Sequence, residues 1–311
     1  MPTVALIGAG LIGRSWANVF ARAGWDVRIT DTNSATLSAA PNLIRQSLDD
    51  LARHGLVTDA KAAAARITPV SSLDKALDGA SFVQESGPEL LDAKIALFAH
   101  LDRLTKPDVI LASSTSAIVA SKFTEKLAGR ARCLVAHPVN PPHLVPVVEL
   151  CGAPWTSADT IARARAIFDG IDMRPIEVRR EVDGFVLNRL QAALLTEAFR
   201  LVEDGVVSPQ DLDRTIADGL GLRWAFMGPF ETIELNAPEG IADYCRRYTP
   251  FLRQVAGDPA PQSVWDAHNW QKAADAWGPT PGAADVLKKS QWRNERLAAL
   301  LAHKRGQKAA S

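Results

Sequence analysis

The sequence has few cysteines and no excess of either charge. Its 311 residues include three cysteines, Cys133, Cys151 and Cys245, whose spacing fits neither a disulfide framework nor a metal site. Lysine plus arginine number 35, as do aspartate plus glutamate, so the formal net charge is +0. Such a chain lacks the broad positive surface that attracts nucleic acids and anionic membranes. We therefore expect a reducing compartment, no metal site and no nucleic-acid partner.

Long apolar runs are missing as well. No stretch approaches the ~20 apolar residues that a helix needs to cross a bilayer. Met1 and Pro2 lead directly into TVALIG, without the basic segment and cleavage site of a secretory signal. These absences predict a cytoplasmic protein that acts on a small molecule and has no membrane partner.

The first half of the chain alternates short β-rich runs with helical patterns, which is typical of a mostly parallel sheet covered by helices. Residues 32–66 have apolar positions at helical spacing with a break near Gly55, and they predict a helical hairpin inserted into this α/β domain. The expected strands cover residues 4–7, 26–30, 65–70, 80–86, 108–114, 132–137 and 145–150.

Strand signals stop near Gly184. Residues 184–205 form one long helical pattern that ends at Gly205, and Ser208 followed by Pro209 predicts the cap and first residue of the next helix. With 311 residues the chain is long enough for two domains. We predict an α/β domain over residues 1–181 and an all-helical domain over residues 182–311.

The segment VALIGAGLIGRSWANVFARAGWDVRITD contains the pattern G-x-G-x-x-G at Gly8, Gly10 and Gly13. A strand precedes the glycines and a helix follows them, which is the context of the dinucleotide-binding fingerprint of Rossmann domains. Gly8 permits the tight turn, Gly10 lets the backbone approach a pyrophosphate, and Gly13 lets helix and strand pack closely. The alternatives are a glycine-rich turn without a ligand and a flavin site.

The helix after this turn presents backbone amides to the phosphates, with those of Leu11 and Ile12 the nearest. Asp31 ends the next strand, 18 residues after Gly13. Its carboxylate is expected to bind the adenosine ribose hydroxyls and to repel a 2′-phosphate. The sequence therefore predicts NAD rather than NADP as the cofactor.

Polar residues at strand ends form a second set of candidates, because open parallel sheets bind ligands beyond the carboxyl ends of their strands. His137 ends one strand and Ser116 follows another. A neutral imidazole has a suitable pKa to take the proton of an alcohol during hydride transfer, and Glu149 is placed to orient it. Ser116 and Asn188 are candidates to bind the substrate oxygen. Ser116 and Asn188 could instead be helix-cap or interdomain polar contacts, Glu149 an edge-strand charge, and His137 a satisfied or solvated histidine. The path from His137 to Glu149 is stiffened by Pro138, Pro141, Pro142 and Pro146.

Several segments resemble the L-3-hydroxyacyl-CoA dehydrogenase superfamily, and most closely its lambda-crystallin / L-gulonate 3-dehydrogenase branch. They are GAGLIGRSW, SSTSAIVASK, AHPVNPPHLVPVVEL, DGFVLNRLQ and GLGLRWAFMGPFETIELN. The resemblance covers nearly the whole chain and implies a homodimer held by the helical domain. It makes His137 the catalytic base, Glu149 its partner, and Ser116 and Asn188 the contacts of the substrate hydroxyl.

The same resemblance assigns Glu89 and Lys94 to the cofactor near the nicotinamide ribose. In the acyl-CoA branch the helical hairpin also carries a lysine that meets the CoA nucleotide. This hairpin reads IRQSLDDLARHG, with Ser47 and Leu48 at the corresponding place. Arg45 and Arg53 could replace that lysine or could be solvated helix charges.

Arg223 follows GLGL and could pair with the carboxylate of a small substrate. Trp224 and Phe226 could instead form a cage for a quaternary ammonium group, as a carnitine dehydrogenase needs. We predict an NAD-dependent dehydrogenase that oxidises the 3-hydroxyl of a small hydroxy acid such as L-gulonate. The alternatives are a 3-hydroxyacyl-CoA dehydrogenase such as one acting on 3-hydroxybutyryl-CoA, a carnitine dehydrogenase, and a structural NAD-binding protein of the crystallin type.

Overall fold

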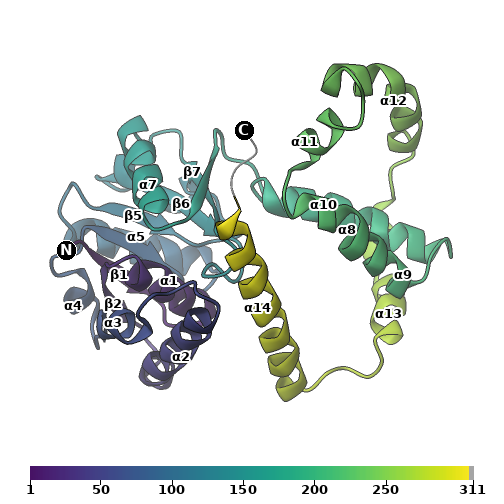
Figure 1. Cartoon of the computed structure of the whole chain (residues 1–311). Coiled ribbons are helices and arrows are strands. Elements are labelled where there is room, and N and C mark those ends of the chain that lie inside the picture. The colour runs from purple at the N-terminus through teal and green to yellow at the C-terminus, as the bar shows by residue number, and fades with distance from the viewer. Residues whose placement is uncertain (308–311) are drawn as a thin grey trace. The chain divides into compact units, whose positions relative to one another are not determined.

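The computed structural model describes residues 1–307 of the chain (Figure 1). Its contacts form two units, one of residues 1–188 together with the segment from residue 289 onward, and one of residues 189–288. The sequence-based division placed the C-terminal segment in the helical domain, and here the structure differs. The reason is apolar packing, because Ala298 is buried in the core of the first unit and Leu297 and Leu301 pack against that core.

The first unit contains an eight-stranded sheet in the order β3-β2-β1-β4-β5-β6-β7-β8. Neighbouring strands are parallel except β6 and β7, which are antiparallel. The predicted mostly parallel sheet is confirmed, whereas β8 and the reversed direction of β7 were not predicted. The strands are β1 (Thr3–Ile7), β2 (Asp26–Thr30), β3 (Ile67–Pro69), β4 (Phe82–Glu85), β5 (Ile110–Ser113), β6 (Cys133–Pro138), β7 (Val147–Gly152) and β8 (Arg174–Val178).

Helices connect the strands, and the predicted hairpin is present as α2 and α3, on either side of a turn at Gly55. Apolar residues of α2 such as Ile44 and Leu48 are buried in the core. The helices of this unit are α1 (Leu11–Arg22), α2 (Ser34–Arg53), α3 (Ala60–Ala65), α4 (Leu73–Leu77), α5 (Leu91–Leu104), α6 (Ser121–Thr124) and α7 (Ala158–Gly170), joined by most of α14 (Ala283–Gly306).

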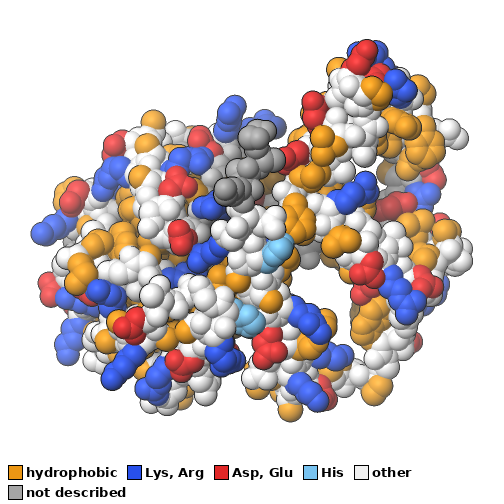
Figure 2. Space-filling model, viewed as in Figure 1, with side chains coloured by type: hydrophobic (Ala, Val, Ile, Leu, Met, Phe, Trp, Pro, Cys, Tyr) orange, Lys and Arg blue, Asp and Glu red, His pale blue; other side chains and the backbone are white. Residues whose placement is uncertain are grey.

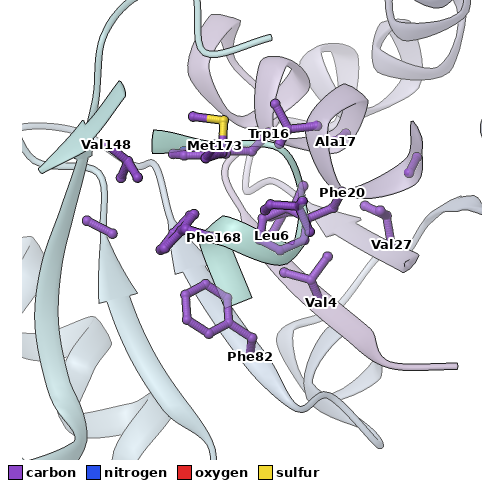
Figure 3. Packing of buried hydrophobic residues seen from close by; sticks show 14 of the residues in the cluster. Val4, Leu6, Trp16, Ala17, Phe20, Val27, Phe82, Val148, Phe168 and Met173 are labelled. Atoms are coloured by element: carbon purple, nitrogen blue, oxygen red, sulfur yellow. The ribbon is translucent and has the colours of Figure 1, made fainter. Parts of the chain in front are cut away.

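Aromatic side chains fix α1 against the sheet (Figure 3). Trp16 and Phe20 of α1, Phe82 of β4 and Phe168 of α7 are all 0% exposed. The ring centroid of Phe168 lies 5.5 Å from that of Trp16 and 5.6 Å from that of Phe82. Because such large buried rings dominate core energetics, this cluster holds the start of α1, where the glycine pattern lies, in a fixed place on the sheet.

The second unit is helical, as predicted. Gly205 follows α8 with a φ of 69°, and the Ser208 hydroxyl caps α9 by accepting from the backbone N–H of Asp211 at 3.1 Å. Its helices are α8 (Leu187–Glu203), which begins in the first unit, α9 (Pro209–Arg214), α10 (Gly221–Trp224), α11 (Pro229–Glu234), α12 (Gly240–Ala256) and α13 (Ala267–Ala276).

The surface carries both charges without separation. Figure 2 shows Lys and Arg side chains interspersed with Asp and Glu over the visible face, which agrees with a net charge of +0. Within residues 1–307, no helix combines the length and the apolar character that a bilayer crossing requires.

Candidate active site

The glycine pattern forms a turn in which two of the three glycines are required by packing. Gly8 has a φ of 106°, and a Cβ there would lie 2.6 Å from the carbonyl oxygen of Ser86. A Cβ on Gly13 would lie only 1.8 Å from the carbonyl oxygen of Gly8, whereas a Cβ on Gly10 would meet nothing within 4 Å. The backbone at Gly10 is therefore open to the approach of a ligand, as a pyrophosphate requires.

The groups around this turn also fit a dinucleotide. Helix α1 begins at Leu11, and among the described residues no side chain caps its first amides, so those of Leu11 and Ile12 can face an anion. The Asp31 carboxylate at the end of β2 accepts from the backbone N–H of Ala9 at 2.7 Å and of Asn33 at 2.8 Å. Asp31 thus lies beside the turn that would hold the pyrophosphate.

Two glycine variants should separate packing from ligand binding. We expect Gly13→Ala to destabilise the fold by about 1 to 3 kcal/mol, the usual cost of overpacking, and to weaken NAD. Gly10→Ala should leave the unfolding midpoint unchanged and still weaken NAD, because its Cβ enters the open space. Denaturant unfolding and NAD titration measure both effects, and equal NAD affinity of Gly10→Ala and wild type would contradict the pyrophosphate assignment.

His137 and Glu149 lie directly opposite each other on the antiparallel strands β6 and β7. Opposite residues of such strands project to the same face of the sheet, and here His137 Nδ1 lies 2.7 Å from Glu149 Oε2. His137 is 5% exposed and Glu149 is 0% exposed. The proline-rich segment between them is therefore the connection of a strand pair, which explains how a 12-residue separation gives direct contact.

Glu149 is also bonded to the backbone at the start of α8. Its Oε1 accepts from the N–H groups of Val186 at 2.8 Å and Leu187 at 2.9 Å. Burial alone would raise the pKa of Glu149, but the hydrogen bonds from His137, Leu187 and Val186 together hold that pKa below its ordinary value. The carboxylate therefore stays charged beside the imidazole.

This depressed pKa predicts how Glu149 contributes to stability. The charged carboxylate stabilises the folded state fully above the ordinary pKa of 4.5, and the contribution is lost as the pH falls through the lower folded-state pKa. We expect the difference in unfolding free energy between wild type and Glu149→Gln to be constant above that pH and to shrink below it. Glu125→Gln, at an exposed position, serves as the control. A difference that grew on acidification would contradict the assignment.

Ser116 is held by Glu89. The Ser116 backbone N–H and hydroxyl donate to Glu89 Oε1 at 2.6 and 3.1 Å, and the Thr115 hydroxyl donates to Glu89 Oε2 at 2.6 Å. The Asn188 side-chain amide donates to the Ser116 carbonyl oxygen at 3.2 Å. Because Asn188 directly follows Leu187, whose amide binds Glu149, contacts within the first unit connect Ser116, Asn188, Glu149 and His137 in one cluster.

The resemblance assigns Lys94 to the cofactor. In the structure its side chain is 2% exposed and its ammonium group binds both carboxylate oxygens of Glu85, and its contact with the cofactor stays a prediction. Glu89, in contrast, is exposed. Arg223 lies exposed on α10 in the second unit, and its assignment to the substrate stays a prediction.

Sequence reasoning missed the groups that hydrogen-bond to the candidate residues and hold them in place. Thr115, Glu85 and the amides of Val186 and Leu187 were not among the candidates, although they bind Glu89, Lys94 and Glu149. The amides carry no signal of residue type, and only their place just before a long helix could have indicated them. Within the described part of the chain, no three His, Cys, Asp or Glu side chains are grouped so as to hold a metal.

Comparison with known protein families decides the assignment. Residues 3–182 match the 3-hydroxyacyl-CoA dehydrogenase, NAD binding domain, and residues 184–276 match the 3-hydroxyacyl-CoA dehydrogenase, C-terminal domain. The chain belongs to the 3-hydroxyacyl-CoA dehydrogenase family. It is an NAD-dependent oxidoreductase, and the resemblance seen in its sequence motifs is confirmed.

Three similar proteins illustrate the range of this family. The lambda-crystallin homolog of Rattus norvegicus is 45% identical over 81% of this chain and 80% of its own length. An L-carnitine dehydrogenase of a Pseudomonas species is 36% identical over 96% of this chain and 92% of its own length. Among solved structures, that of the NAD-dependent dismutase 5-formyl-3-hydroxy-2-methylpyridine 4-carboxylic acid 5-dehydrogenase covers 99% of this chain and 100% of its own, with a TM-score of 0.85 and 27% identity.

Proposed function

We propose that the chain oxidises the 3-hydroxyl group of a small hydroxy acid with a free carboxylate, such as L-gulonate, to the 3-keto acid. The observation that carries this proposal is the buried His137–Glu149 pair, which contacts connect to Ser116 and Asn188. An imidazole oriented by a buried carboxylate is a general base of the kind that alcohol oxidation needs.

In this mechanism each residue has one task. The bond between His137 Nδ1 and Glu149 leaves Nε2 as the ring atom that receives the hydroxyl proton. The negative charge of Glu149 then stabilises the imidazolium. Ser116 and Asn188 bind and orient the substrate hydroxyl. The glycine turn and Asp31 would hold NAD, which would supply the acceptor for the hydride from C3.

The helical hairpin supports a free acid over a CoA thioester. Of the two positions where the resemblance suggests a lysine, Ser47 accepts from the Asn18 side chain at 3.0 Å and Leu48 is 0% exposed. The two possible substitutes already have partners, because Arg45 binds Asn42 and Arg53 lies 2.7 Å from Asp50. Neither Ser47 nor Leu48 therefore supplies the cation that a nucleotide phosphate would meet in the acyl-CoA branch.

The names of similar proteins include both classes of substrate. One relative is an L-carnitine dehydrogenase, and the name of the dismutase contains a carboxylic acid. The family description and another relative of 38% identity, in contrast, name an acyl-CoA. A 3-hydroxyacyl-CoA such as 3-hydroxybutyryl-CoA is therefore the second candidate substrate.

A substrate panel tests the proposal. NADH formation would be measured with L-gulonate, L-3-hydroxybutyrate, L-carnitine and 3-hydroxybutyryl-CoA at matched concentrations. We expect the highest kcat/KM with L-gulonate or another free hydroxy acid that lacks an ammonium group. A thioester turned over far better than every free acid would establish the second candidate instead.

The cofactor preference should follow Asp31. Wild type should prefer NAD over NADP, because the negative charge of the Asp31 carboxylate repels a 2′-phosphate. Asp31→Ala should lower the ratio of kcat/KM with NAD to kcat/KM with NADP. Asp78→Ala, which removes an exposed carboxylate elsewhere on the first unit, serves as the control. Equal kcat/KM of the wild type for the two cofactors would contradict the assignment.

We also propose that the chain works as a homodimer in the cytoplasm. The support is the exposed aromatic surface of the second unit around residues 223–235, where Trp224, Phe226 and Phe230 are 39, 53 and 74% exposed. Large exposed apolar patches mark interaction sites. Sedimentation analysis of wild type and Phe230→Glu measures the oligomeric state, and a monomeric wild type would overturn this proposal.

A further inference from the structure

A hydrogen-bond network joins α1 to the ends of neighbouring strands of the sheet, and the Ser114 hydroxyl is its centre. Trp16 Nε1 and Gln84 Nε2 donate to Ser114 Oγ at 3.0 and 2.7 Å. Ser86 Oγ lies 2.9 Å from the same oxygen. Trp16 and Gln84 are both 0% exposed. These four side chains, called here the Ser114 network, were not among the residues that the sequence assigned to the cofactor.

The orientation of the Gln84 amide is fixed by a second partner. Its Nε2 also donates to the carbonyl oxygen of Ala136 at 3.3 Å. Because a carbonyl oxygen can only accept, the atom that lies between Ala136 and Ser114 is the nitrogen of the amide and not its oxygen. Gln84 therefore donates to Ser114 and does not accept from it.

The direction of the remaining hydrogen bond follows from the capacity of a hydroxyl group, which accepts two hydrogen bonds and donates one. Ser114 Oγ already accepts from Trp16 and Gln84, so its own hydrogen is donated to Ser86 Oγ. The hydroxyl hydrogen of Ser86 is then left to donate elsewhere. Within residues 1–307 no group accepts it.

Ser86 lies beside the glycine turn. Its backbone N–H donates to the Ile7 carbonyl oxygen at 2.7 Å, and its carbonyl oxygen is the atom that a Cβ on Gly8 would meet at 2.6 Å. The Ser86 Cβ lies 3.9 Å from the place of a Cβ on Gly13. Ser86 also directly follows β4, and parallel sheets bind ligands beyond the carboxyl ends of their strands. Its half-buried side chain is thus at the predicted pyrophosphate site.

We propose that the Ser86 hydroxyl is a further cofactor-binding group, which donates to an oxygen of the NAD pyrophosphate. Trp16 and Gln84 direct this donor through Ser114 and are positioning residues. A donor whose direction is fixed before the ligand arrives loses little freedom on binding, which favours affinity. The Gln84 amide fits this role better than a role in stability, because its Oε1 is buried without a partner among the described residues.

Ser86→Ala tests the inference, because it removes the hydroxyl and keeps the backbone contacts. We expect the NAD dissociation constant to rise about 10-fold, the scale of one hydrogen bond to a charged group. The constant for ADP-ribose, which contains the pyrophosphate, should rise equally, and that for adenosine, which has no phosphate, should stay within about twofold. Ser81→Ala is the matched control, because Ser81 precedes the other end of β4 and its hydroxyl donates to the Thr3 carbonyl oxygen at 3.1 Å.

Trp16→Phe tests whether the network directs the donor, because it keeps an aromatic ring in the core and removes the N–H. It should raise the NAD dissociation constant about 2- to 5-fold, less than the loss of the hydroxyl itself. Combined with Ser86→Ala it should cause no further loss, since Trp16 acts on NAD only through Ser86. Gln84→Met carries the same two expectations, so the test stands if Trp16→Phe unfolds. Additive losses in the double variants would overturn the directing role.

Calorimetric titration without substrate measures all these constants, so the result does not depend on which hydroxy acid is oxidised. Wild-type NAD affinity of Ser86→Ala would overturn the inference. An equal rise for adenosine would overturn it as well, because it would mean a general distortion of the site. Gly10→Ala separates this inference from the placing of the pyrophosphate: if that variant weakens NAD and Ser86→Ala does not, the inference about Ser86 alone fails.

Discussion

Replacing His137 by alanine should lower kcat by about 10² to 10⁴, the usual contribution of a general base. The variant loses the only group of the cluster that can take the hydroxyl proton near neutral pH, while the glycine turn and Asp31 remain. The affinity for NAD should therefore stay unchanged. Steady-state kinetics with the substrate found in the panel and NAD titration by fluorescence measure the two quantities.

His100→Ala is the matched control, because His100 is exposed on α5 and lies in the same unit. It should keep the wild-type kcat. Glu149→Gln should lose less than His137→Ala, since the amide can still orient the ring and only the charge is removed. If His137→Ala retained most of the wild-type kcat, the proton would be taken by another group and the mechanism would be wrong.

Replacing Arg223 by alanine should raise the KM of the free hydroxy acid roughly 10- to 100-fold. The reason is the loss of a hydrogen bond between two charged groups, which contributes about 1.5 to 3 kcal/mol. A thioester has no carboxylate to lose, so its KM should change much less. The NAD dissociation constant should not change, because the cofactor residues all lie in the first unit.

Arg253→Ala is the control for this prediction, since Arg253 is an exposed arginine on α12 of the same unit. It should leave the KM of every substrate unchanged. An equal rise in KM for free acid and thioester would mean that Arg223 supports the structure of its unit rather than the carboxylate. The same two variants measured with L-carnitine show whether the carboxylate of that compound uses the same arginine.

The parts of the site that depend on local chain geometry could be predicted from the sequence. The spacing of Gly8, Gly10 and Gly13 and the strand, turn and helix patterns around them are local features of the sequence. β8 was missed because its short sequence RPIEV contains a proline, an arginine and a glutamate and shows no apolar alternation. The pairing of Lys94 with Glu85 could not be predicted, because Glu85 comes from a neighbouring strand end and burial of a charged pair leaves no periodic signal.

The direct contact between His137 and Glu149 also required the structure. The residues and the proline-stiffened path between them could be recognised from the sequence, but their contact depends on β7 being antiparallel to β6, and prolines do not determine the direction of a strand. The contacts of Glu89 also required the structure, because Thr115 and Ser116 reach it from another strand end. In each case the missing information is which strands are neighbours in the sheet.

The return of α14 to the first unit has a consequence for synthesis of the protein on the ribosome. The first 188 residues contain every strand of the sheet, yet the core they form also includes Ala298, and Arg305 pairs with Asp172 at 3.2 Å. The nascent chain must therefore carry this core unfinished while about a hundred further residues are translated. A premature stop before residue 289 would remove the part of α14 that packs in the core of the nucleotide-binding unit, and not a dispensable tail.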